Sequence, residues 1–113
     1  MQVNNMEESL LFYEEVVGLE ENRRFEAGPD MEIVFLGNGE TQVELIDNKN
    51  NNGINIDQGI SLGFEVESIN EMMAFVKEKG ISIHSGPFEP APNVAFFYVL
   101  DPNGLKIQFI ENK

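Results

Sequence analysis

The feature that most constrains the fold is an internal repeat. The segment from Val43 to Asn48 matches that from Ile107 to Asn112 at an offset of 107 − 43 = 64 residues, which makes Glu44 and Gln108 equivalent positions. A unit of this length that occurs twice indicates a duplicated module rather than an array of short repeats. Ahead of these segments the offset is 63 residues, and the matched pairs are Val3/Val66, Asn5/Ser68, Met6/Ile69, Glu8/Glu71 and Phe12/Phe75.

The first copy predicts one helix followed by three strands. Asn5 is a good N-cap, apolar residues recur at helical spacing after it, and Gly18 ends the pattern. Three strand-like runs separated by turn residues then predict an antiparallel meander, over 19–26, 31–36 and 41–46. Only Gln2 and Val3 precede the cap, so the leading strand of this copy is predicted to be truncated.

The second copy predicts the same order of elements with a full leading strand. In chain order we expect a strand over Ile60–Val66, a helix from the cap Ser68 to Gly80, a short strand Ile81–His84, an extended loop over 85–92, a strand Val94–Leu100 and a final strand after Asp101. The loop contains three prolines, which make it stiff. The strand after it is apolar on both faces, a pattern typical of a strand that is covered twice.

These elements predict an α+β fold of two βαβββ modules that form a mixed, curved sheet around a shared concavity, with the first strand truncated. We expect a single domain over residues 1–113, in which module one spans about 1–48, an asparagine-rich linker spans 49–59 and module two spans 60–113. The strand positions that alternate with the apolar ones are expected to face the concavity, and they are Gln42, Glu44, Ile46, Ser61, Gly63, Glu65, Lys106, Gln108 and Ile110.

Charge and composition exclude several classes of function. Twenty acidic residues against seven basic ones give a net charge of −13, which leaves no basic surface for a nucleic acid. The absence of cysteine excludes disulfides, thiolate zinc sites and a cysteine nucleophile. No stretch approaches the roughly 20 apolar residues of a membrane span, and the N-terminal residues lack the pattern of a signal peptide, so we expect a cytoplasmic location and no membrane partner.

The sequence resembles the glyoxalase/bleomycin-resistance/dioxygenase superfamily, also called the vicinal oxygen chelate proteins, which are built from paired βαβββ modules. The resemblance covers nearly the whole chain and is carried by the segments 7–10, 12–14, 17–19, 42–45, 63–66, 101–104 and 107–108. It implies the fold more than one activity, because the superfamily includes isomerising lyases, dioxygenases, thiol transferases and proteins that sequester antibiotics.

The resemblance implies a possible metal site. In metal-dependent members of that superfamily, His or Glu residues from the first, fourth, fifth and eighth strands hold a divalent ion. The fourth-strand position is Glu44 here, the fifth is Ser61, the eighth is Gln108, and the first would lie ahead of Met1. Only one carboxylate of the ligand set is retained. A divalent metal is therefore disfavoured as a cofactor. If a metal does bind, Glu44 and Gln108 are its expected ligands.

The candidate site residues follow from these positions. Glu44 is expected to anchor a ligand or to act as a general base, and the alternative is a solvated residue on an exposed strand. Ser61 and Gln108 are expected to bind the ligand with it. His84, the sole histidine, is a further candidate because the proline-rich loop is expected to cover the pocket, although a lone histidine is more often structural. Phe97 is included as an aromatic wall, although strand alternation sends it to the face opposite Phe96 and Tyr98.

Three functions remain open at this point. The first is a small-molecule-binding protein with a degenerate metal site, expected to be a homodimer. The second is a metal-dependent lyase of the glyoxalase type, with Glu44 as its base. The third is a sequestering protein for a cationic antibiotic, which the acidic charge would suit. Arg23 and Arg24 are expected to point to opposite faces of their strand, so at most one of them reaches the concavity.

Overall fold

The computed structural model describes residues 1–39, 41–50 and 59–113. The chain divides into two compact units, Met1–Asn55 and Ile56–Lys113, so the division falls inside the predicted linker over 49–59. Most of that linker lies outside the described residues. Each unit corresponds to one copy of the repeat. The single-domain organisation and the shared concavity remain predictions.

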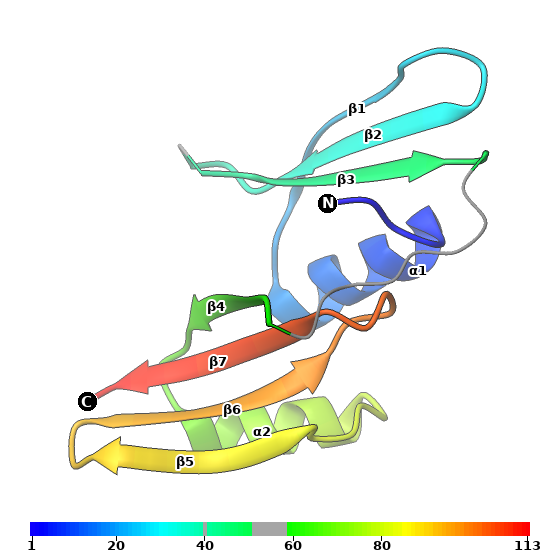
Figure 1. Cartoon of the computed structure of the whole chain (residues 1–113). Coiled ribbons are helices and arrows are strands. Elements are labelled where there is room, and N and C mark those ends of the chain that lie inside the picture. Colours follow the sequence, from blue (N-terminus) through cyan, green and yellow to red (C-terminus); the bar gives the residue numbers. More distant parts are fainter. Residues whose placement is uncertain (40, 51–58) are drawn as a thin grey trace. The chain divides into compact units, whose positions relative to one another are not determined.

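Unit 1 contains a helix packed on a three-stranded sheet (Figure 1). The helix begins as α1 (Met6–Leu11) and continues as a π-helix, η1 (Phe12–Val17). The strands β1 (Glu21–Glu26), β2 (Met31–Leu36) and β3 (Val43–Asn48) pair antiparallel in the order β1-β2-β3, which confirms the predicted meander.

Unit 2 contains a four-stranded mixed sheet with one helix, α2 (Ile69–Glu78), against one of its faces (Figure 1). The sheet order is β4-β7-β6-β5, in which β4 pairs parallel with β7 and the other neighbours pair antiparallel. The strands are β4 (Ser61–Glu65), β5 (Ser85–Ala91), β6 (Val94–Leu100) and β7 (Lys106–Asn112).

The leading segment pairs parallel with the last strand in both units, over a full strand in unit 2 and through a single bridge in unit 1. In unit 2, Glu65 pairs parallel with Ile110, and the N–H of Val66 donates to the carbonyl oxygen of Ile110 at 2.8 Å. In unit 1 the same connection is reduced to one isolated parallel bridge between Gln2 and Ile46. The N–H of Val3 donates to the carbonyl oxygen of Ile46, again at 2.8 Å. The α+β class and the βαβββ order of elements are therefore confirmed.

Both helices are fixed at their N-termini by the same two devices. The predicted caps are present, since the side chains of Asn5 and Ser68 accept hydrogen bonds from the third N–H that follows. A carboxylate at the end of the last strand adds a second bond. Asp47 Oδ2 accepts from the N–H of Met6 at 3.1 Å, and its repeat equivalent Glu111 accepts from the N–H of Ile69 at 2.7 Å. Sequence patterns had not indicated this link between strand and helix.

The structure of the proline-rich segment and of the residues before it differs from two predictions. Residues 81–84 form no strand, and the expected loop is instead β5, which occupies the edge of the sheet. An edge strand tolerates Pro87 and Pro90 because only one of its sides must supply hydrogen bonds, and the register between β5 and β6 is accordingly irregular. The segment is thus part of the sheet rather than a cover over a pocket.

Two smaller expectations also change. The first helix was expected to be α-helical up to Gly18, but its second half is wound more widely, and the N–H of Gly18 donates to the carbonyl oxygen of Tyr13. Phe12, Tyr13 and Val16 are the buried residues of this half. Along β6 burial alternates from residue to residue, so only the helix-facing side of that strand is fully buried. No helix within the described ranges is long and apolar enough to cross a membrane.

Candidate binding site on the open face of unit 2

Each sheet has one face packed against its helix and one face turned away from it, which we call the open face. The strand register assigns residues to these faces, because residues directly opposite each other on neighbouring strands lie on the same side of a sheet. In unit 2, Gln108 is opposite both Gly63 and Tyr98, and in the next row Phe96 is opposite both Ile110 and Phe88. These residues lie on the open face.

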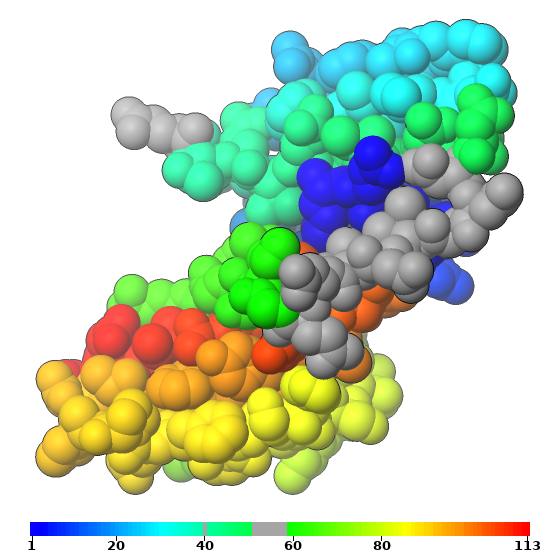
Figure 2. Space-filling model, in the orientation of Figure 1, coloured from blue at the N-terminus to red at the C-terminus, as the bar shows by residue number. Residues whose placement is uncertain are grey.

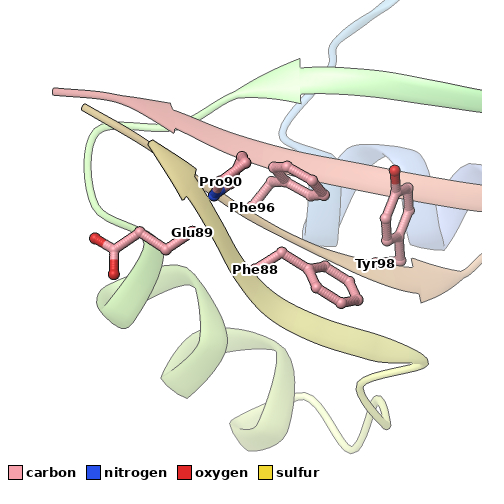
Figure 3. A pocket seen from close by; sticks show the side chains of 5 residues that line it. All are labelled: Phe88, Glu89, Pro90, Phe96 and Tyr98. Atoms are coloured by element: carbon pink, nitrogen blue, oxygen red, sulfur yellow. The ribbon is translucent and has the colours of Figure 1, made fainter. Parts of the chain in front are cut away.

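Three aromatic side chains gather there, and we call Phe88, Phe96 and Tyr98 the aromatic cluster (Figure 3). The centroids of Phe88 and Phe96 are 5.5 Å apart, those of Phe96 and Tyr98 are 5.8 Å apart, and those of Phe88 and Tyr98 are 6.4 Å apart. Phe88 comes from β5 and the other two from β6, and their rings lie on the same side of the strands, whereas Glu89 points away from them (Figure 3).

The aromatic cluster lines an open groove of about 510 Å³, together with Glu89 and Pro90. In the space-filling view the side chains of β5 and β6, in yellow and orange, form a continuous part of the visible surface (Figure 2). Phe88 is 44% exposed although its ring is fully apolar. A surface of this size and character is typical of ligand sites, because apolar rings exposed together gain free energy when a ligand covers them.

A polar pair adjoins the aromatic cluster. Gln108 Nε2 donates to the phenol oxygen of Tyr98 at 3.2 Å, which leaves the phenol hydrogen available to donate elsewhere. Gly63 makes room for the amide, since a Cβ at that position would lie only 3.0 Å from Gln108 Oε1. The ammonium group of Lys106 lies 5.8 Å from the centroid of the Tyr98 ring. The open face therefore offers stacking surfaces next to hydrogen-bonding groups.

The remaining predicted residues of unit 2 lie outside this groove. Phe97 is completely buried and its ring packs 5.5 Å from that of Phe109 on the helix-facing side, so its assignment as a ligand-contacting wall is corrected to a core role. The expected alternation between Phe97 and its two neighbours is confirmed. Ser61 is exposed at the start of β4, opposite Lys106. His84 is exposed and lines a different groove, with 81–83 and Leu100.

The open face of unit 1 has a different chemistry. Glu44 is half-buried on β3 and lies opposite Phe35, which in turn lies opposite Arg23 on β1. Arg23 and Arg24 point to opposite faces, as predicted. Arg24 lies on the helix side and forms salt bridges with Glu7, Glu21 and Glu32, at 2.9, 3.6 and 2.8 Å. Hydrogen bonds to Glu32 and then to Glu7 hold the pKa of the Arg24 guanidinium above its ordinary value.

The side chains do not fit the metal site implied by the resemblance. Among the described residues no three His, Cys, Asp or Glu side chains come together in a way that could hold a metal ion. At the three ligand positions that this sequence contains, Glu44 supplies the only anionic oxygen, Gln108 is engaged with Tyr98 through its amide nitrogen, and Ser61 offers a hydroxyl. Transition metals bind imidazole and anionic ligands far better than such a set.

Comparisons with known proteins agree on one family. The model of the Glyoxalase/Bleomycin resistance protein/Dioxygenase superfamily matches residues 1–109. Lactoylglutathione lyases from Neisseria meningitidis serogroups A and B are each 31% identical over 121 residues, which cover 100% of this chain and 87% of the relative.

Solved structures show the same fold. A trypanothione-dependent glyoxalase I from Leishmania major superimposes with a TM-score of 0.81 at 26% identity, covering 98% of this chain and 81% of the other. A glyoxalase family protein from Enterococcus faecalis gives a TM-score of 0.78 over 97% of this chain and 91% of the other, and at 24% identity it bears on the fold alone.

Proposed function

The chain belongs to the Glyoxalase/Bleomycin resistance protein/Dioxygenase superfamily, and from this premise we propose that it binds a small organic molecule on the open face of unit 2, without the metal site of the catalytic members. The observation that carries the proposal is the aromatic cluster beside the Gln108–Tyr98 pair. Tyr98 belongs to both features, so a ligand stacked on its ring would also lie near its hydroxyl group.

The groove suggests the class of ligand. Aromatic rings stack well on planar or apolar groups, and each good contact of this kind is worth about 0.5–1.5 kcal/mol beyond the area that it buries. The phenol of Tyr98 donates a hydrogen bond, so it favours a carbonyl or similar acceptor on the ligand. We therefore expect a planar or aromatic molecule that carries at least one acceptor oxygen.

A thermal-shift and calorimetric screen of aromatic metabolites and drugs tests this proposal. A ligand present at 100 times its dissociation constant should stabilise the protein by about 2.7 kcal/mol. Phe96→Ala should lower the affinity, because Phe96 belongs to the aromatic cluster. Ile33→Ala should leave the affinity unchanged, because Ile33 is the equivalent residue on the sheet of unit 1. A screen without any saturable binder, or a binder that is indifferent to both changes, would refute the proposal.

A second candidate is a glyoxalase-type lyase, which is favoured by the 31% identity to the two lactoylglutathione lyases and by the retention of Glu44. In that case Glu44 would move the proton during isomerisation of the thiol adduct of an oxoaldehyde. The candidate predicts a stoichiometric divalent ion in protein purified without chelator, and loss of activity in Glu44→Gln. Protein without such an ion and without turnover would exclude it.

The net charge of −13 favours one further candidate, a protein that sequesters a cationic antibiotic. Electrostatic attraction is screened by salt, so binding of such a drug should weaken as the ionic strength rises. An affinity that does not change with salt would count against it. In all three cases we propose a cytoplasmic homodimer, and light scattering coupled to size-exclusion chromatography would measure the oligomeric state.

A further inference from the structure

Arg23 occupies an unusual position on the open face of unit 1. Its guanidinium carbon lies 5.2 Å from the ring centroid of Phe25 and 5.0 Å from that of Phe35, and the two rings are stacked with centroids 6.3 Å apart. The register places Arg23 opposite Phe35, so both side chains lie on the face turned away from the helix. The two aromatic rings hold the guanidinium at a defined place on the sheet.

The charge of Arg23 has no acidic partner within the described residues, although the chain contains twenty carboxylates and only seven basic residues. The neighbouring Arg24 illustrates the contrast, because it contacts three glutamates. Glu44 lies in the same row as Arg23, but Phe35 stands between them and no salt bridge joins them. The ring contacts engage the positive charge without using its hydrogen-bond donors.

An arginine in this setting is suited to one kind of ligand. The guanidinium presents a rigid fork of N–H donors that matches a carboxylate in a bidentate arrangement, and each such bond is stronger than one between neutral groups. Phe25 is 40% exposed next to it and offers an apolar contact. A ligand that places a carboxylate on the guanidinium can therefore cover the phenyl ring with its apolar part.

We propose that Arg23, together with Phe25 and Phe35, forms a binding site for a carboxylate attached to an apolar group. This site belongs to the open face of unit 1 and stands independently of the groove in unit 2. The rest of the acidic chain repels anions, so the site gains selectivity from one localised cation rather than from a basic surface.

The arginine side-chain NMR spectrum tests this proposal directly, because the chain contains only two arginines and each contributes one Nε–Hε resonance. Titration with benzoate should shift the Arg23 resonance in a saturable manner. The Arg24 resonance should stay in place, since its Nε already donates to Glu32 at 2.8 Å. Benzamide, a neutral isostere, should bind at least about tenfold more weakly. No saturable shift, or equal binding of benzamide, overturns the proposal.

Two further experiments test whether the site prefers a carboxylate and whether Arg23 binds it. Phenyl phosphate should bind no more tightly than benzoate, and tighter binding would overturn the assignment to a carboxylate. In ligand-observed NMR with fluorobenzoate, Arg23→Gln should lower the affinity about tenfold and Arg23→Lys less. Lys77→Gln, which makes the same change in net charge on the exposed side of α2, should alter the affinity less than about twofold. Equal losses in Arg23→Gln and Lys77→Gln would refute the site.

Discussion

The two units share one scaffold and differ in what their open faces present. Both tie a helix to the last strand through a carboxylate, and both pair the leading strand parallel to that strand. Their open faces nevertheless differ in chemistry. Unit 1 places Arg23 against two phenyl rings with Glu44 in the same row, whereas unit 2 places the aromatic cluster beside the Gln108–Tyr98 pair. The register gives the equivalent pairs, unit 1 first, as Glu44/Gln108, Phe35/Tyr98, Ile33/Phe96 and Phe25/Phe88.

The difference shows which side of each sheet is free to change. On the helix-facing side the equivalents stay apolar and fully buried, as in Leu45/Phe109, Val34/Phe97 and Leu36/Val99. A polar group there would lose its hydration without gaining a partner, whereas a residue on the open face can exchange carboxylate for amide at little cost. Glu44 and Gln108, where the resemblance implies metal ligands, lie on the open faces, so a substitution at these positions changes the surface chemistry without removing a core contact.

We expect the greatest difference in stability between the helix-facing side and the open face of the unit 2 sheet, sampled at Phe97 on β6 and Phe88 on β5. Phe97→Ala should destabilise the protein by about 3–5 kcal/mol, because it removes a completely buried ring, whereas Phe88→Ala on the open face should cost less than about 1 kcal/mol. Unfolding in urea, followed by circular dichroism, measures both values. Similar costs for the two variants would show that Phe97 is not a core residue.

Next in size is the contrast between equivalent positions on the two open faces. Phe96→Ala should weaken binding of an aromatic ligand about tenfold, since it removes the central ring of the aromatic cluster. Ile33→Ala removes apolar surface from the same row of unit 1 and should leave the affinity within about twofold. Calorimetry on both variants measures the contrast, and a larger loss in Ile33→Ala would place the ligand on the other unit.

Asp47 and Glu111 bind the helix N-termini of the two units in the same way. Asp47→Ala and Glu111→Ala should each lower the free energy of unfolding by about 1 kcal/mol, because each removes an acceptor from a helix N-terminus. Glu78→Ala, an exposed change at the other end of α2, serves as the control and should have little effect. If only one of the two capping variants is destabilised, the units do not share this device.

The smallest expected effect concerns Gly63. A Cβ at this position would lie 3.0 Å from Gln108 Oε1, so Gly63→Ala should displace the amide by a few tenths of an ångström and weaken its bond to Tyr98. The affinity for the ligand should fall about threefold with little change in stability. Ser61→Ala on the same strand is the control and should leave the affinity unchanged. If Gly63→Ala lowered the affinity as much as Phe96→Ala does, Gly63 itself would contact the ligand.

The sequence was a good guide wherever local chemistry decides the structure. The caps Asn5 and Ser68 were identified from hydrogen-bonding side chains at the right spacing, and β2 has the predicted bounds Met31–Leu36. It failed for β5, because the prolines indicate a loop unless the segment is known to lie at a sheet edge. Strand order is a property of the whole unit and is not encoded in the seven residues of β5.

The candidate site was predicted only in part. The open-face positions of Glu44 and Gln108 followed from alternation along the strands. The hydrogen bond from Gln108 to Tyr98, the gathering of Phe88 with Phe96 and the rings around Arg23 depend on register between strands that the sequence does not reveal. Phe97 was included as a wall although strand alternation already placed it on the face opposite Phe96 and Tyr98.

In the proposed function, a small molecule binds to the aromatic cluster on the open face of unit 2. The most direct test of this proposal is the set of intermolecular nuclear Overhauser effects between a bound ligand from the screen and protein carrying ¹³C-labelled phenylalanine and tyrosine rings. We predict contacts to Phe88, Phe96 and Tyr98 and none to the buried rings of Phe97 and Phe109. Contacts confined to the rings of unit 1 would place the ligand on the other sheet and refute the proposed site.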